Sequence, residues 1–215
     1  MDKKWKEFSF EVNLEKIKKI LEIIKNEKNI VIDFEAFDLN FETKDFPLIF
    51  GYSKLDFNKE ELTFFMEEYK SIFTLDSNKN LKSFWEKELG CWFECNKEKQ
   101  FIFLDSKLEL QIFNKFIGVE KSNIKYIDLY DVLKESINWK IPSTSFHKTK
   151  FINFVMEDYK TVIDARKIKE FFSFYLNNIE WKNRERYIAE TKEKNLKDLN
   201  TMIEILNWLN KLVFN

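Results

Sequence analysis

The 215-residue sequence is poor in the residues that break, bend or crosslink a chain. It contains three glycines, two prolines, two cysteines and one histidine. Cys91 and Cys95 are too few for a secreted disulfide framework, and with a single histidine they are too few for a structural zinc site. The neighbours of these cysteines in "CWFEC" are typical of a strand, so we expect both thiols to be buried.

The sequence also lacks a long apolar run and an excess of charge of either sign. No segment is apolar enough to span a bilayer, and "MDKKWKEFSF" turns polar again at once, so we expect a cytoplasmic protein without a membrane partner. Thirty-six basic residues nearly balance thirty-seven acidic ones. Any binding of nucleic acid must therefore use a local patch of charge.

Hydrophobic residues make up 44% of the chain, which is enough to bury a full core. Their spacing predicts strands and helices in alternation, with the first helix over 14–29 and a short helix over 80–89 that ends at Gly90. The predicted strands cover 30–37, 46–57, 61–69, 99–105 and 124–130, with a helix as the alternative for 61–69. The later helices cover 106–118, 131–139, 144–156, 164–179 and 197–213. This order favours an α/β fold in which helices flank a mixed sheet.

The segment "IVIDFEAF" brings two acids, Asp33 and Glu35, to the end of an apolar strand. Alternation in a strand sends both carboxylates to one face, while Ile32 and Phe34 point to the other. Two carboxylates held close repel each other, so such a pair needs either a cation between them or free access to water. On spacing alone, a solvated sheet edge is the commoner explanation. Carboxylate oxygens are nevertheless the ligands that Mg²⁺ prefers.

Further acids fall where strands pass into helices, at one edge of the expected sheet. "FIFLDSKLELQIF" contributes Asp105 at a strand end and Glu109 in the following helix. The later acids of this kind are Asp128, Asp131, Asp158 and Asp164. If several of these side chains converge on the first pair, the sequence predicts a metal site.

At this point the sequence resembles a known family. "VIDFEAF", "FLDSKLELQIF", "YIDLYDVL" and "YKTVIDARKI" occur in the order and rough spacing of the motifs of the DEDD 3′–5′ exonucleases, which have an RNase H-like fold. The branch that looks nearest is the ERI-1/KapD type. The resemblance covers about 29–174. We therefore expect a helical segment over 1–28, an RNase H-like domain over 29–178 and a C-terminal helical extension over 179–215.

The resemblance implies two Mg²⁺ or Mn²⁺ ions held by four acids, and release of nucleotides from the 3′ end of RNA or single-stranded DNA. Asp33, Glu35 and Asp164 would be metal ligands. The second motif leaves Glu109 and Asp105 as alternatives, with Glu109 in the slot that the family gives to Asp. Tyr159 stands where one branch has its catalytic histidine. In a sister branch, three residues separate a tyrosine from the acid that follows it, whereas four residues separate Tyr159 from Asp164.

Two kinds of function follow from these residues. The first is a metal-dependent exonuclease with Asp33, Glu35, Glu109, Tyr159 and Asp164 in catalytic roles. The second is a degenerate exonuclease-fold module that binds nucleic acid or a protein partner, which Tyr in place of His and Glu in place of Asp would favour. An acid-rich adaptor with no nuclease ancestry would require the order of the motifs to be a coincidence.

Overall fold

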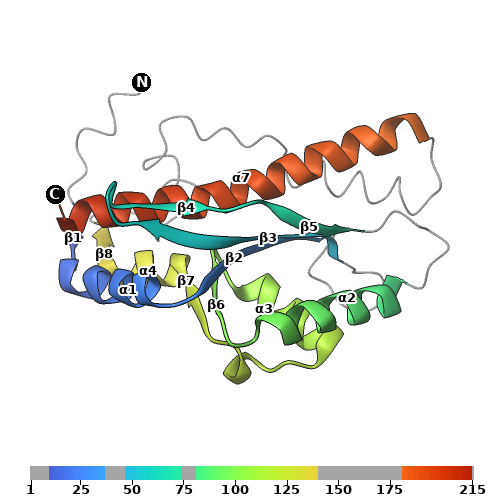
Figure 1. The fold of residues 1–215 in the computed structure, drawn as a ribbon, viewed down its shortest axis with the longest axis horizontal. Helices are drawn as coiled ribbons and strands as arrows, with labels where there is room; N and C mark the ends of the chain where they lie inside the picture. The colour runs from blue at the N-terminus through green and yellow to red at the C-terminus, as the bar shows by residue number, and fades with distance from the viewer. Residues whose placement is uncertain (1–9, 37–46, 74–80, 140–180, 215) are drawn as a thin grey trace.

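The computed structural model describes residues 10–36, 47–73, 81–139 and 181–214 (Figure 1). Tyr159 and Asp164 lie outside these residues, as do the helices expected over 144–156 and 164–179. Within the four ranges, no helix is long and apolar enough to cross a membrane.

The centre of the molecule is a six-stranded mixed sheet with the strand order β4-β3-β2-β6-β7, in which β5 also pairs with β3. Strands β2, β3, β4 and β5 are joined by antiparallel pairings, whereas β6 and β7 continue the sheet on the other side of β2 in parallel. The strands are β2 (Asn29–Ala36), β3 (Pro47–Asn58), β4 (Thr63–Met66), β5 (Lys70–Phe73), β6 (Gln100–Phe103) and β7 (Tyr126–Asp128).

Helices form two apolar clusters with the two faces of this sheet. One cluster contains residues of α1 (Leu14–Asn26), α4 (Leu129–Ser136) and α7 (Trp181–Phe214). The other contains α2 (Leu81–Asn96) and α3 (Lys107–Ile117), and it is rich in aromatic rings. Figure 1 shows α7 running along β3 and β4, with α2 and α3 on the opposite side of the sheet.

A second, two-stranded sheet joins the beginning of the described chain to the end of α4. Its strands β1 (Phe10–Val12) and β8 (Ile137–Trp139) are antiparallel. A 3₁₀ turn, η2 (Lys121–Asn123), lies between α3 and β7.

The alternation of β2 decides which side chains meet which helices. Ile32 and Phe34 are buried in the cluster of α2 and α3, where the ring of Phe34 stacks on that of Phe50 with 4.4 Å between centroids. Val31 is buried in the cluster that contains α7. Since side chains two apart along a strand share a face, Asp33 and Glu35 point with Val31 towards α7.

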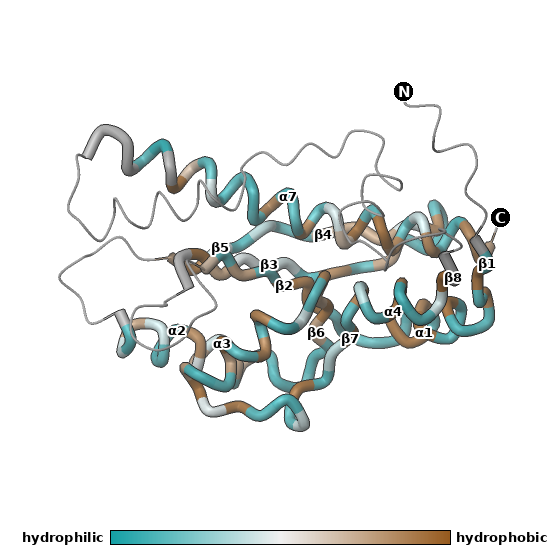
Figure 2. The backbone as a smooth tube through the Cα atoms, turned by 180° about the vertical axis from the view of Figure 1, so that it is seen from behind, coloured by the Kyte–Doolittle hydropathy of each residue, from teal (hydrophilic) through white to brown (hydrophobic). Residues whose placement is uncertain are grey.

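Amide side chains of α7 attach it to β4 and to the hairpin before it. Asn207 donates to the carbonyl of Phe64 and accepts from the amide of the same residue, at 2.9 and 2.6 Å. Asn210 donates to the carbonyl of Leu62 at 2.7 Å. Edge strands present backbone groups that invite pairing with other chains, and here the helix covers this edge of the sheet. In Figure 2, α7 alternates between teal and brown along its length, as an amphipathic helix does.

The expected fold class is confirmed: the chain has an α/β architecture with a mixed sheet flanked by helices and a helix at the C-terminal end. The order of antiparallel and parallel strands is consistent with an RNase H-like fold.

Three local expectations are wrong. The second helix does not end at Gly90 but continues to Asn96, because buried rings on both sides of the glycine, Trp85 and Trp92, hold α2 against the sheet. Cys91 and Cys95 therefore lie on a helix, and both are exposed. The helix expected over 131–139 gives way to β8 at Ile137, because pairing with the distant strand β1 outweighs local helical periodicity.

Candidate functional site

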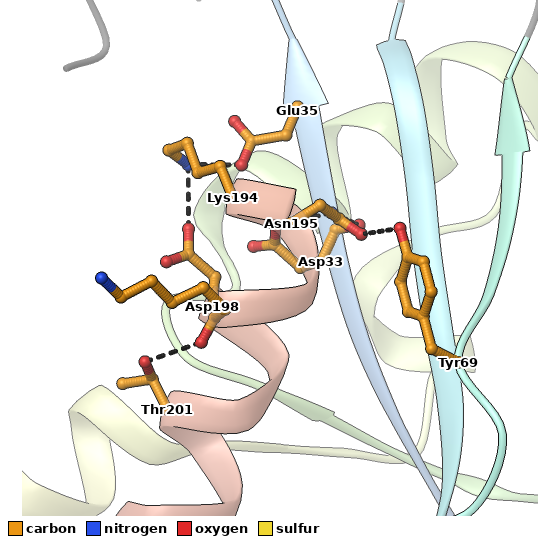
Figure 3. Close-up of polar contacts among 8 residues, drawn as sticks. Asp33, Glu35, Tyr69, Lys194, Asn195, Asp198 and Thr201 are labelled. Carbon is orange, nitrogen blue, oxygen red and sulfur yellow. Dashed lines mark hydrogen bonds and ion pairs between the residues drawn. The ribbon is translucent and has the colours of Figure 1, made fainter. Parts of the chain in front are cut away.

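Three carboxylates converge between β2 and α7. Asp33 and Glu35 come from β2 and Asp198 from α7, and each offers an oxygen that lies within 4.8 Å of the other two (Figure 3). Glu35 is buried, and Asp33 and Asp198 are half-buried. In the part of the chain that the structure describes, this is the group of carboxylates close enough together to share a metal ion.

Lys194 brings a positive charge into this acidic cluster. Its ammonium group is ion-paired with Oε1 of Glu35 and, at 2.9 Å, with Oδ2 of Asp198. Lys194 and Asp198 are four residues apart on a helix and therefore lie on the same side of it. Figure 3 shows the lysine side chain extending from α7 towards Glu35.

Asn195 holds the remaining acid from the same turn of α7. Its amide nitrogen donates to Oδ2 of Asp33 at 2.8 Å and to the carbonyl of Asp33 at 3.0 Å. The hydroxyl of Tyr69 donates to the amide oxygen of Asn195 at 3.0 Å, which fixes the amide with its nitrogen towards Asp33. Asn195 is fully buried.

Gly51 makes room for the Asn195 side chain. This residue lies opposite Asp33 in the pairing of β2 with β3. A Cβ atom added at Gly51 would lie 1.6 Å from Oδ1 and 2.6 Å from Cγ of Asn195, far inside van der Waals contact. The lack of a side chain at this one position of β3 therefore lets α7 approach the sheet beside the acids.

The electrostatics of the site follow from burial and from crowding of like charges. Burial raises the pKa of Asp33 well above its usual range, and the neighbouring carboxylates Glu35 and Asp198 raise it further. Burial disfavours the charged form of Lys194, but the attraction of Glu35, Asp198 and Asp33 together outweighs it and raises the pKa of Lys194 above the ordinary value. The lysine therefore stays charged and partly neutralises the acids.

Neither of the two alternatives for the second motif belongs to the group of three. Glu109 is buried in the first turn of α3, and its charge also raises the pKa of Asp33. Asp105 lies between β6 and α3 and is half-buried. Of the two, Glu109 is therefore the one that acts electrostatically on Asp33.

Asp128, which the sequence also offers as an acid at a strand end, has a structural role. It is the N-cap of α4 and accepts from the amides of Tyr130 and Asp131. Its second carboxylate oxygen accepts from the amide of Ser106 at 2.7 Å. Asp128 thereby ties the start of α4 to the turn that precedes α3.

Sequence reasoning missed Lys194, Asn195 and Asp198. The helical period of apolar residues begins near 197, so the sequence placed the start of the last helix there, whereas α7 begins at Trp181. The available signal was the spacing in "KNLKD", which puts a lysine and an aspartate one turn apart. Tyr159 and Asp164, the residues expected to complete the site, lie outside the described residues.

The chemistry of the donors fits a hard divalent cation such as Mg²⁺ or Mn²⁺, because the three groups that converge offer carboxylate oxygens. One oxygen of each acid already accepts a hydrogen bond from Lys194 or Asn195. The arrangement can therefore bind a cation with oxygen ligands that are held in fixed positions from two elements of the fold.

Comparison with known proteins finds likeness in structure but not in sequence. No family model matches the chain, and no curated protein matches it. Among solved structures, the EXO domain of Nibbler from Aedes aegypti matches with a TM-score of 0.42 and 12% sequence identity, over 93% of this chain and 92% of that one.

Proposed function

We propose that the protein is a metal-dependent 3′–5′ exonuclease that hydrolyses the phosphodiester bonds of RNA or single-stranded DNA. The observation that carries this proposal is the convergence of Asp33, Glu35 and Asp198 from a central strand and a distant helix. Like charges are brought together at a cost in free energy, and binding of a cation is a physical reason for a fold to do so. The order of the motifs around Asp33 and Glu35 supports the same activity.

In this proposal Asp33, Glu35 and Asp198 hold the metal. A bound Mg²⁺ or Mn²⁺ would supply Lewis-acid polarisation of the phosphate and lower the pKa of a water molecule. Asn195 keeps the carboxylate of Asp33 in one orientation, and Glu109 adds negative charge beside it. Asp105 remains the alternative to Glu109 as the acid of the second motif.

The test is cleavage of RNA that carries a label at its 5′ end. With Mn²⁺ present, we expect the RNA to shorten stepwise from its 3′ end, and Asp33→Asn to abolish the shortening. Asp56→Asn is the matched control, because Asp56 lies on the neighbouring strand β3 with 41% of its side chain exposed, in a surface ion pair with Lys54. Equal activity in Asp33→Asn and wild type would refute the proposed role of the cluster.

Two residues are candidates for the third metal ligand. The resemblance points to Asp164, whereas the group of three carboxylates contains Asp198. We propose that Asp198 is the ligand. Asp198→Asn is then expected to abolish shortening, whereas Asp164→Asn leaves it measurable. The opposite result would assign the role to Asp164. Tyr159→His tests whether Tyr159 occupies the position of the family's catalytic histidine, and raised activity would support that position.

A second candidate function is a degenerate exonuclease-fold module that binds a nucleic acid or a protein. The pairing of Lys194 with Glu35 and Asp198 favours it, since the acids then already have a cation. Three residues separate Lys194 from Asp198. In the sister branch a tyrosine stands at this distance before the acid, so Lys194 would take the place of that tyrosine. Binding of single-stranded RNA without shortening at any Mn²⁺ concentration would favour this candidate over the enzyme.

A further inference from the structure

The ion pairs of Lys194 differ from the other described lysine pairs in their shielding from water. The side chain of Lys194 is 19% exposed, and its partners Glu35 and Asp198 are 7% and 17% exposed. In the surface pair of Lys16 with Glu135, the corresponding values are 38% and 59%. Exposed pairs contribute little and exchange readily with water, whereas a shielded pair is a fixed part of its site.

The position of the lysine is set by the fold on both sides. Asn195, the next residue, is anchored by hydrogen bonds to Asp33, which keeps this turn of α7 against β2. Asp198, one turn further along, accepts from the same ammonium group as Glu35. The ammonium group thus bridges an acid of the strand and an acid of the helix, as a metal ion between them would do.

The balance of charge limits how many divalent cations the site binds. When ionised, Asp33, Glu35 and Asp198 together with Lys194 carry a net charge of minus two, and the nearby Glu109 adds one more negative charge. One divalent cation leaves this group with a net charge of minus one, whereas a second would leave an excess of positive charge in a shielded place, where charge is costly. Two ions in a hydrolytic site also lie only about 3.5–4 Å apart. Here the ammonium group already lies between Glu35 and Asp198, where a second ion would need its oxygen ligands.

We propose that Lys194 replaces one of the two divalent ions, so that the site binds a single Mg²⁺ or Mn²⁺ per chain. This inference rests on the proposed function for the place of the ion, and it differs from the pair of ions that the resemblance implies. Lys194 is a built-in counter-charge for Glu35 and Asp198, and Asn195 fixes Asp33 beside it.

The experiment is titration of the metal-free full-length protein with MnCl₂ in a calorimeter. We expect one Mn²⁺ per chain for wild type and two per chain for Lys194→Met, which keeps the apolar stem and removes the charge. Lys194→Arg keeps the charge and is expected to bind one ion. Lys211→Met, which changes an exposed lysine on the same helix, is expected to match wild type. Glu35→Gln is expected to weaken binding at least tenfold, which places the ion at the cluster.

Two Mn²⁺ per wild-type chain, no Mn²⁺ on the wild-type chain, or a single ion on Lys194→Met would each overturn the proposal, as would unchanged binding by Glu35→Gln. Electron paramagnetic resonance of the wild-type protein with excess Mn²⁺ removed gives a test that does not depend on the folding of any variant. An isolated Mn²⁺ spectrum is expected, and the spectrum of an exchange-coupled pair would refute the inference.

These outcomes are separate from those of the proposed function. A wild-type chain that binds one Mn²⁺ and never shortens RNA contradicts the exonuclease and leaves the stoichiometry intact. A chain that shortens RNA with two bound Mn²⁺ supports the exonuclease and overturns the role of Lys194.

Discussion

The contact between Gly51 and Asn195 leads to a prediction for Gly51→Ala. The new methyl group would lie 1.6 Å from the amide oxygen of Asn195. Asn195 is fully buried and short, so it has no room to swing aside while it keeps its hydrogen bonds to Asp33 and Tyr69. Either the amide leaves its place or α7 moves away from β3.

The size of the effect follows from the bonds at stake. A hydrogen bond to a charged group contributes about 1.5–3 kcal/mol, and a neutral one such as that from Tyr69 contributes about 1 kcal/mol. Overpacking with the bonds kept costs about 1–3 kcal/mol instead. The first route costs about 2.5–4 kcal/mol and the second about 1–3 kcal/mol, so we expect Gly51→Ala to lower the free energy of unfolding by about 1–4 kcal/mol.

Urea unfolding followed by far-UV circular dichroism measures this loss. Gly90→Ala is the matched control, because a Cβ at Gly90 meets its nearest atom, Cγ2 of Ile117, at an ordinary 3.8 Å. In the interior of α2 that change should stabilise by about 0.5–1 kcal/mol. Asn195→Ala removes the three atoms nearest to the new methyl group. If Gly51→Ala costs as much in the Asn195→Ala background as in wild type, the proposed contact is refuted.

Three other changes should also lower the free energy of unfolding. Asp128→Ala removes the N-cap of α4 and the bond to the turn before α3, and is expected to cost about 2–3 kcal/mol in urea unfolding. Lys25→Met keeps the apolar stem but loses the 2.7 Å bond to Asn210 and the cation–π contact with Phe57 at 4.4 Å, at a cost of about 1–2 kcal/mol. Asn207→Ala leaves backbone groups of β4 without their side-chain partner, and hydrogen exchange there should quicken as stability falls by about 1–2 kcal/mol.

Each of these changes has a control on the same helix. Asp131→Ala, in the first turn of α4, should cost less than about 1 kcal/mol because it removes an interaction with the helix dipole and leaves the N-cap Asp128 in place. Lys18→Met on α1 and Asn200→Ala on α7 alter exposed side chains and should stay within about 0.5 kcal/mol of wild type. A control that destabilises as much as its partner would show that the loss does not come from the named contact.

Much of the fold follows from local patterns that the sequence displays. The alternation in "IVIDFEAF" predicts a strand with both acids on one face, and β2 has this arrangement, with Ile32 and Phe34 buried on the other. The helix of α1 follows from its apolar period and buries Ile17, Leu21 and Ile24. In these elements local propensity and burial agree, so the pattern alone is sufficient.

Elements that depend on distant partners were harder to predict. The first half of α7 has a weak apolar period because it covers the polar end of β2, where Lys194 and Asn195 meet acids. Gly90 lowers helix propensity by about 1 kcal/mol, yet burial of its neighbours outweighs that cost. Neither the polar contacts of α7 nor the burial around Gly90 can be read from the local sequence.

The sequence by itself determined that Asp33 and Glu35 share one face of a strand, because the two-residue repeat of a strand is a property of the backbone. Only the tertiary structure decided what they face. The packing of α7 across β2 and β3 brings Lys194 and Asp198 to them, and it depends on apolar contacts and on a glycine far away in the chain. Such contacts are set by the summed burial of the whole helix, so no short motif encodes them.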